Sequence, residues 1–384
     1  MLYYQKNCGL SPQYYRQEQK MEILYENILS IEWKMVVMWV IGGLLIYLAI
    51  KKDMEPTLLL PMGFGAILVN LPESGAAEVV NRLFDIGIDN GELMPLILFI
   101  GIGAMIDFTP LLSNPKYMIF GAAAQFGIFF TLCLASFLGY GLNDAASIAI
   151  IGAADGPTSI FVAQVLKSNY LPAIMVAAYS YMALVPIVQP PIIKLCTTKK
   201  ERLIRMDDTS KTVSKTTKIL FPIITTIIVG LVAPDAVALI GFLMFGNLIR
   251  ECGVLNSLSE TAQKVLANLV TIFLGITIAS RMTADEFIRL DTVIILCLGL
   301  VAFVFDTFGG IMIAKLINLF SKKKINPMIG AAGISAFPMS ARVVHKLGLA
   351  EDNQNFLLMH AVGVNVSGQI ASVIAGGLIL SIVG

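Results

Sequence analysis

Two stretches of this 384-residue sequence are apolar but interrupted in the middle: SIAIIGAADGPTSIFVAQVLK at residues 147–167 and PMIGAAGISAFPMSARVVHKL at residues 327–347. Glycine and proline end one helix and allow another to begin, so each stretch predicts a broken helix. Backbone without helical hydrogen bonds is tolerated at membrane depth only where protein or a water-filled cavity surrounds it. For either stretch taken alone, an ordinary kinked helix is the alternative.

The chain around these stretches is too apolar for a soluble protein. Hydrophobic residues make up 57% of it and charged residues 14%, whereas soluble domains contain about 25% charged residues. This composition excludes a soluble enzyme, a disordered chain and a collagen-like chain. A bilayer-spanning helix needs about 20 mostly apolar residues. Such helices are expected near residues 35–50, 57–72, 93–108, 117–139, 172–196, 219–233, 234–248, 267–280, 291–319 and 356–383.

Charge and metal-binding residues narrow the function classes further. The net charge is +1, which gives no case for nucleic-acid binding. The five cysteines are widely scattered, and the only histidines are His345 and His360. The sequence therefore predicts neither a disulfide framework nor a zinc site.

Short motifs recur in the same order in the two halves of the chain, at a nearly constant spacing of 174 to 180 residues. Such a pattern indicates an internal duplication. Paired interrupted segments in corresponding halves are the best sequence pointer to the binding site of a transporter. The matches are GF at 63–64 and 241–242, F-x-G-I at 99–102 and 273–276, GAA at 152–154 and 330–332, and Gln189 with Gln369.

The distribution of basic residues predicts the topology. If each broken stretch is a re-entrant hairpin, each half has five crossings and the two halves are inverted. About 19 basic residues, including those of the 194–218 loop, then share one side, and four lie on the other when the N-terminal arm is left out. Full crossings would place Lys51 and the 194–218 loop on opposite sides. The positive-inside rule therefore favours hairpins, the first from outside and the second from the cytoplasm, with tips meeting near the midplane.

We expect an all-α polytopic membrane protein of two inverted repeats, each of about five transmembrane helices with a re-entrant broken-helix hairpin. Its expected location is the cell (inner) membrane. The expected organisation is a polar arm or interfacial helix at 1–34, a first repeat at 35–197 with its hairpin at 147–167, a cytoplasmic basic connector at 198–218, and a second repeat at 219–384 with its hairpin at 327–347.

The hairpin tips carry the polar residues that suggest a site. Asp155 precedes Gly156 and Pro157, and an ionisable group at membrane depth is a functional candidate by default. The alternative, that Asp155 caps the following half-helix, is compatible with such a role. Hard monovalent cations prefer carboxylate, amide, hydroxyl and carbonyl oxygens. Side chains that could supply such a cage are those of Asp155, Asn326, Ser335 and Asn365.

Asp306 is a second carboxylate expected inside the membrane, near the middle of the crossing at 291–319. It either lines an ion path or pairs with a polar group to fix its helix. The sequence does not decide between these two roles.

Three motifs together resemble the membrane-embedded beta subunit of sodium-translocating biotin-dependent decarboxylases, a family that includes oxaloacetate, methylmalonyl-CoA, glutaconyl-CoA and malonate systems. The motifs are GAADGPTSIF at 152–161, NPMIGAAGISAFPMSARVV at 326–344 and HAVGVNVSGQIAS at 360–372. The resemblance extends from about residue 35 to the C-terminus. It implies that carboxybiotin, carried on a partner subunit, is decarboxylated here while a proton is consumed and Na⁺ is exported.

The resemblance also implies partners and residue roles. The partners are a carboxyltransferase (alpha) subunit, a biotin carrier protein, a small membrane subunit and further copies of the chain. Asp155 would bind sodium and handle a proton, with Tyr181 as its hydroxyl partner and a proton carrier. Arg342 would hold the carboxylate of carboxybiotin, which a guanidinium can bind with two hydrogen bonds. The remaining matched positions are Asn326, Gly330, Ser335 and Asn365.

Two other function classes fit parts of the pattern. A secondary sodium/proton exchanger or sodium–carboxylate symporter could have similar inverted repeats without biotin or covalent chemistry. A purely structural membrane anchor would leave the polar residues at both tips unexplained.

Overall fold

The structure is a computed structural model that describes residues 27–52, 56–73, 75–89, 93–207 and 212–384. The regular elements of these residues are all helices, as the sequence predicts. Most of the N-terminal arm predicted at 1–34 lies outside the described residues. The main helices of the first half are α2 (Trp33–Lys52), α3 (Pro56–Val69), α4 (Ala76–Phe84), α5 (Leu93–Met105), α7 (Met118–Ala124), α8 (Phe126–Phe137), α9 (Leu142–Ala149), α10 (Gly156–Val165) and α11 (Leu171–Cys196).

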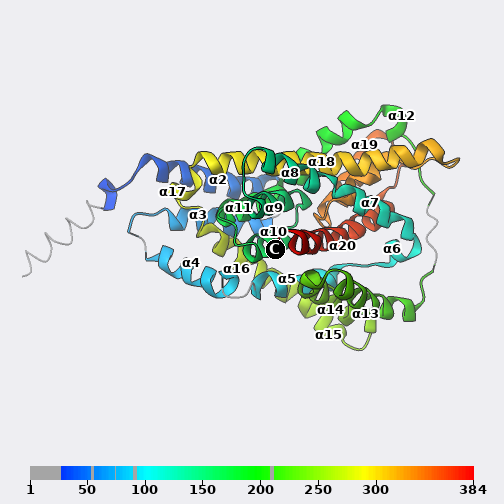
Figure 1. Cartoon of the computed structure of the whole chain (residues 1–384), viewed down its shortest axis with the longest axis horizontal. Coiled ribbons are helices and arrows are strands. Elements are labelled where there is room, and N and C mark those ends of the chain that lie inside the picture. Colours follow the sequence, from blue (N-terminus) through cyan, green and yellow to red (C-terminus); the bar gives the residue numbers. More distant parts are fainter. Residues whose placement is uncertain (1–26, 53–55, 74, 90–92, 208–211) are drawn as a thin grey trace, which may run out of the picture.

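The second half also consists of apolar helices joined by short connections. Its two longest, α18 and α20, lie in the body of the molecule, where α18 runs along most of its length and α20 passes beside α10 (Figure 1). The main helices are α13 (Lys215–Val232), α14 (Val237–Cys252), α16 (Ala267–Ala279), α18 (Leu290–Phe320), α19 (Met339–Glu351) and α20 (Leu358–Val383).

Helix lengths and composition fit a polytopic membrane protein. Seven spans of the described residues are long and apolar enough to cross a bilayer, or eight if the bent pair 76–89 and 93–105 forms one span. Each of the ten apolar ranges expected from the sequence overlaps a helix. Because lipid offers no hydrogen bonds to the backbone, apolar segments of this length satisfy their peptide groups as helices.

Small residues allow helices of the two halves to pack closely. A Cβ added at Gly103 of α5 would lie 1.8 Å from the carbonyl oxygen of Leu243 in α14. One added at Gly246 of α14 would lie 2.0 Å from the carbonyl oxygen of Ile100 in α5. Close backbone approach at small residues is the usual way in which membrane helices associate. The α3 and α16 helices pack in the same manner through Gly65 and Gly275.

Both interrupted stretches are broken where the sequence predicts. In the first, α9 continues as a short 3₁₀ turn (Ile150–Ala153) and stops at Ala154, whose φ of 51° is left-handed. The second consists of a 3₁₀ turn (Pro327–Gly333), an irregular segment and α19. The two breaks touch, because the backbone N–H of Ser335 donates to the carbonyl oxygen of Ala153 at 3.0 Å. Two segments about 180 residues apart in the chain therefore meet inside the protein.

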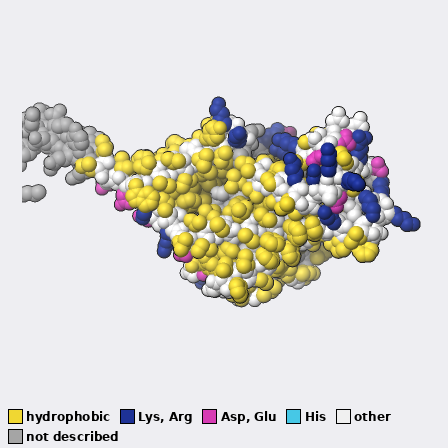
Figure 2. Space-filling model, turned by 90° about the horizontal axis from the view of Figure 1, so that it is seen from above, with side chains coloured by type: hydrophobic (Ala, Val, Ile, Leu, Met, Phe, Trp, Pro, Cys, Tyr) yellow, Lys and Arg dark blue, Asp and Glu magenta, His cyan; other side chains and the backbone are white. Residues whose placement is uncertain are grey.

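Basic side chains gather at one end of the molecule. Figure 2 shows Lys and Arg concentrated at the end where Figure 1 places α12 (Lys199–Arg202), α19 and the C-terminus of α18, with mostly apolar side chains over the middle of the visible surface and fewer charged ones elsewhere. The start of the connector is fastened here, since Arg202 pairs with Glu351 at 2.7 Å and Arg205 with Asp352 at 2.6 Å. We call this the basic end.

Candidate functional site

Asp155 lies at the first break and caps the helix that follows it. As the N-cap of α10 it has an extended backbone, and its Oδ1 accepts from the backbone N–H of Thr158 at 3.5 Å. The Thr158 hydroxyl donates to Asp155 Oδ2 at 2.8 Å. The capping role considered from the sequence is therefore present. The long backbone hydrogen bond goes to Oδ1, and the shorter hydroxyl bond goes to Oδ2.

Three further side chains, all from the second half of the chain, donate hydrogen bonds to Asp155 Oδ2. Ser335, at the second break, donates its hydroxyl to Asp155 Oδ2 at 3.1 Å. From α20, Gln369 Nε2 donates at 2.9 Å and the Ser372 hydroxyl at 3.3 Å. Ser335 and Ser372 also lie 3.0 Å apart, oxygen to oxygen. Asp155 is thus the centre of a polar cluster that joins both breaks to α20.

The cluster is closed to solvent, and the described residues offer Asp155 no counter-charge. Asp155 is 3% exposed and Ser372 is fully buried. Among the described residues, no Lys, Arg or His forms an ion pair with Asp155. A buried carboxylate without a counter-charge costs several kcal/mol, so the site is expected to hold a cation or a proton. Its carboxylate, hydroxyl and amide oxygens are the ligands that a hard monovalent cation prefers.

Tyr179 of α11 is the aromatic neighbour of this cluster. A Cβ added at Gly156 would lie 2.5 Å from the Tyr179 ring, so the ring packs directly against the residue after Asp155. Tyr179 is 1% exposed, and its hydroxyl has no hydrogen-bond partner among the described residues. A buried hydroxyl is normally paired, so this one is available for a ligand or for a rearranged state of the site.

Asn365 and Gly330 hold the second break in position. Asn365 Nδ2 donates to the carbonyl oxygens of Ala332 at 3.1 Å and Ile334 at 2.7 Å, on either side of Gly333. Its buried Oδ1 has no partner among the described residues. Gly330 lies against α18, where a Cβ would come within 2.0 Å of the carbonyl oxygen of Gly310. Asn365 therefore orients the segment that carries Ser335, with one amide oxygen still unused.

The other residues predicted from the sequence form their hydrogen bonds with partners other than Asp155 or lie at the surface. Asn326 donates to the carbonyl oxygens of Arg202 and Ile204, both at 2.9 Å, and so ties the connector to the second broken stretch. Tyr181 donates its hydroxyl to the carbonyl oxygen of Leu296 in α18. Arg342 is exposed in the first turn of α19.

Asp306 lies in the middle of α18 and is fully buried. Its Oδ1 accepts from the backbone N–H of Ile128 at 3.1 Å, next to the start of α8. Its Oδ2 has no hydrogen-bond partner among the described residues and faces Gly152, where an added Cβ would lie 2.7 Å from it. The contact to α8 is compatible with the helix-fixing role, one of the two roles that the sequence left open for Asp306.

Three members of the cluster were not predicted as site residues from the sequence: Thr158, Ser372 and Gln369, the last of which was noted only as the repeat partner of Gln189. Thr158 stands three residues after Asp155, the usual spacing between an N-cap and the N–H that it accepts from. Gln369 and Ser372 are three apart on α20, so they share a helix face. These spacings predict a polar face on α10 and another on α20. They do not predict that both faces contact the carboxylate of Asp155.

The fold and the cluster together define a polytopic membrane protein with an occluded, cation-suited site between two broken helices. The family model described as Na⁺-transporting oxaloacetate decarboxylase beta subunit matches residues 34–383. The chain belongs to this family.

Similar proteins carry three kinds of decarboxylase name. An oxaloacetate decarboxylase beta chain of Haemophilus ducreyi is 46% identical, over 92% of this chain and 96% of its own length. A glutaconyl-CoA decarboxylase subunit beta of Acidaminococcus fermentans is 48% identical, over 93% and 96%. A methylmalonyl-CoA decarboxylase subunit beta of Propionigenium modestum is 46% identical, over 91% and 95%.

Proposed function

We propose that this protein decarboxylates carboxybiotin and couples that reaction to Na⁺ export, with Asp155 as the sodium ligand. The observation that carries the proposal is the buried Asp155 carboxylate, which has four side-chain donors and no cationic partner among the described residues. When sodium binds beside Asp155, the side chains of Ser335, Ser372 and Gln369 would turn their oxygens toward the ion in place of the hydrogen bonds that they now donate to the carboxylate. Asp155 would alternate between sodium and a proton.

Asn365 and Asn326 have separate parts in this proposal. The unpaired amide oxygen of Asn365 is a further sodium ligand, reached by a small shift of the segment that it already holds. Asn326 was grouped with the ligands from the sequence. In this proposal its contribution depends on release of its bonds to the connector.

Reciprocal contacts support two inverted repeats as the framework of transport. The motif spacing relates α3 to α14 and α5 to α16, and each partner packs across the halves: α5 against α14 and α3 against α16. The matched glutamines behave likewise. Gln369 of the second half reaches Asp155 in the first break, and Gln189 of the first half donates to the carbonyl oxygen of Ala331 in the second broken stretch at 2.7 Å. In this proposal both broken stretches are re-entrant, and access to Asp155 alternates by rocking or elevator motion.

Tyr181 and Arg342 keep the roles that the family resemblance implies. For Tyr181 to carry a proton to or from Asp155, its hydroxyl must leave Leu296 during the cycle. Tyr181→Phe is then expected to lower the turnover rate about 100-fold. The turnover rate of Tyr179→Phe, which removes the other tyrosine hydroxyl of this part of α11, is measured for comparison. If Tyr181→Phe lowers only thermal stability, the hydroxyl has a packing role alone.

The exposed Arg342 would meet the carboxylate of the incoming carboxybiotin at the basic end. The carboxyltransferase subunit, the biotin carrier and the small membrane subunit would assemble on a homo-oligomer in the inner membrane, with the basic end toward the cytoplasm. Related names cover three different acids or acyl-CoA esters. The acid itself is therefore assigned to the carboxyltransferase partner.

The experiment that tests this function uses the complex purified from its native membrane. We expect avidin to detect a biotinylated partner, and we expect the complex to decarboxylate free N-carboxybiotin at a rate that rises with Na⁺ concentration. A Na⁺ transporter that co-purifies with no biotinylated protein, and that leaves carboxybiotin intact, would instead be a secondary exchanger or symporter.

A further inference from the structure

A cavity of about 410 Å³ lies at the basic end, away from Asp155. Its lining comes from the N-terminus of α7, the C-terminus of α18, the connector at Met206 and Asp207, and the first turn of α20. The volume falls in the range of about 300–1,000 Å³ that is usual for small-molecule sites. The cavity is therefore large enough for a compact two-ring molecule.

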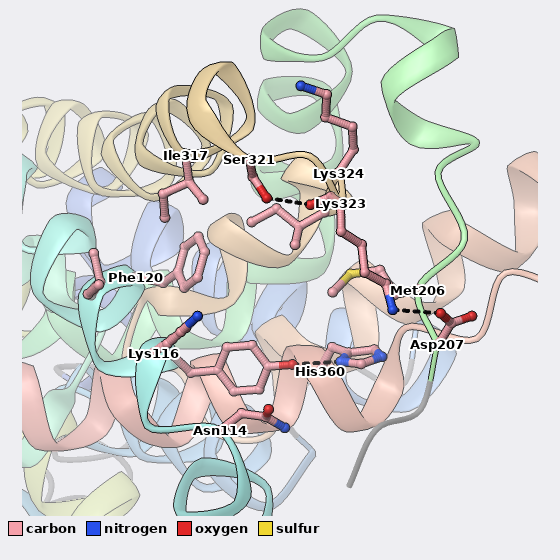
Figure 3. Close-up of a pocket in the computed structure, with 13 residues that line it drawn as sticks. Asn114, Lys116, Phe120, Met206, Asp207, Ile317, Ser321, Lys323, Lys324 and His360 are labelled. Atoms are coloured by element: carbon pink, nitrogen blue, oxygen red, sulfur yellow. Dashed lines mark hydrogen bonds and ion pairs between the residues drawn. The ribbon is translucent and has the colours of Figure 1, made fainter.

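The cavity combines apolar walls with excess positive charge. Phe120, Ile317 and Ile325 are among the apolar side chains that line it. Its charged lining consists of three lysines and one aspartate, and the aspartate, Asp207, is paired with Lys323 at 2.7 Å. Lys116 forms no ion pair among the described residues. Figure 3 shows Lys116 and Phe120 on one side of the cavity and Lys323 on the other. An apolar molecule with one anionic group fits this lining.

A hydrogen-bonded pair of proton-carrying groups borders the same cavity. The Tyr117 hydroxyl oxygen lies 2.6 Å from Nδ1 of His360, and both residues are largely buried, at 8% and 6% exposure. Figure 3 shows this bond as the dashed line that ends on His360. Phenol and imidazole are both able to give up and take back a proton. The cavity therefore has in its lining a proton source and an ammonium group that forms no ion pair within the described part of the chain.

We propose that this cavity binds the ring system of carboxybiotin, with Lys116 holding the N-carboxylate and the Tyr117–His360 pair supplying the proton. This inference rests on the proposed function and assigns the decarboxylation of carboxybiotin to this cavity. The N–C bond breaks, CO₂ leaves, and the electron pair stays on the ureido nitrogen. A proton from the pair converts that nitrogen to N–H, and cytoplasmic water returns a proton to the pair. Arg342 does not line the cavity, so its contact with the carboxylate would precede this step.

One helix carries both the cavity and the sodium cluster. His360 is in the first turn of α20, and Gln369 follows nine residues later, about 13 Å along the axis. Tyr117 also touches this helix, since a Cβ added at Gly363 would lie 2.6 Å from its ring. A change in the cavity can therefore reach the donors of Asp155 through α20.

The test measures decarboxylation of free N-carboxybiotin by the purified complex, together with Na⁺-dependent thermal stabilisation. Lys116→Gln should raise KM for carboxybiotin about tenfold, as expected for loss of a charged hydrogen bond. The matched control, Lys346→Gln, removes an exposed lysine of α19 that does not line the cavity and should leave KM unchanged. His360→Gln should lower kcat about 100-fold with little change in KM.

The stabilisation by Na⁺ separates a lost catalytic group from a misfolded protein. If His360→Gln loses this stabilisation, Tyr117→Phe, a smaller change, decides the role of the pair by the same kcat criterion. Unchanged KM in Lys116→Gln, or unchanged kcat in a folded Tyr117 or His360 variant, would overturn the cavity proposal. A wild-type complex that leaves carboxybiotin intact would instead overturn the proposed function.

Discussion

Asp155 and Asp306 are both buried carboxylates inside the membrane-spanning part of the protein, but their partners differ in kind. Asp155 Oδ2 accepts from four side chains on three segments. Asp306 Oδ1 accepts from a backbone N–H at the start of a helix. Hydroxyl and amide side chains can rotate and present oxygen to a cation, whereas a backbone N–H is fixed and only donates. In our proposal, the type of partner, more than burial, therefore separates the sodium site at Asp155 from a structural contact at Asp306.

The strongest way to break this comparison is to neutralise each carboxylate in turn. Asp155→Asn removes the charge that holds sodium and should lower Na⁺-coupled decarboxylation at least about 100-fold. Asp306→Asn keeps a carbonyl oxygen that can accept from Ile128, so its rate should change less than about threefold. The measurement is decarboxylation in reconstituted vesicles with and without Na⁺. Equal losses in the two variants would show that the comparison is mistaken.

The donors from α20 sharpen the comparison. Gln369→Ala and Ser372→Ala each remove one partner of Asp155 and should raise the Na⁺ concentration for half-maximal rate about tenfold. Ser367→Ala is the matched control on the same helix, because the Ser367 hydroxyl donates to the carbonyl oxygens of Val364 in α20 and of Tyr117 in the turn before α7. A Na⁺ titration of the rate distinguishes them. A shift as large in Ser367→Ala would indicate general loosening of α20.

A third pair of charges, exposed at the basic end, should have the smallest effect. The hydrogen bond from Arg205 lowers the pKa of Asp352 below its ordinary value. Because the folded pKa is depressed, the stability from this pair is present above the ordinary Asp pKa of about 3.9 and is lost as pH falls through the folded value. Arg205→Gln should therefore speed amide exchange in residues 203–207 at pH 7. The difference from wild type should shrink as pH falls below about 4 and should vanish once Asp352 is protonated in the folded protein. A difference that persists after that protonation would mean that Arg205 acts through another contact.

Composition predicts much of this fold because lipid leaves the backbone few choices. Each of the ten expected apolar ranges overlaps a helix, and glycine and proline mark both breaks near Asp155 and Ser335. The break between α7 and α8 at Gln125 was missed, since the apolar run there continues without proline. Local sequence therefore specifies which segments are helical and where glycine or proline breaks them. It specifies only weakly where packing bends a helix.

The site was only partly predictable for the same reason. Asp155 and Ser335 were selected as polar residues at breaks, and the structure joins them at 3.1 Å. Gln369 and Ser372 lie 214 and 217 residues from Asp155 in the chain, so their contact arises from tertiary packing. Asn326 has the same amide chemistry as Asn365, yet its amide nitrogen donates to carbonyl oxygens of the connector. Residue type predicted what these side chains can bind, and the fold decided which of them meet.

Direct binding of sodium to the purified protein is the simplest test of whether Asp155 is the sodium ligand. Equilibrium binding of radioactive Na⁺ in detergent would be compared among wild type, Asp155→Asn and Asp306→Asn, with folding checked by thermal unfolding. We predict saturable binding in wild type and in Asp306→Asn, and none in folded Asp155→Asn. Saturable binding of wild-type strength in Asp155→Asn would contradict this prediction.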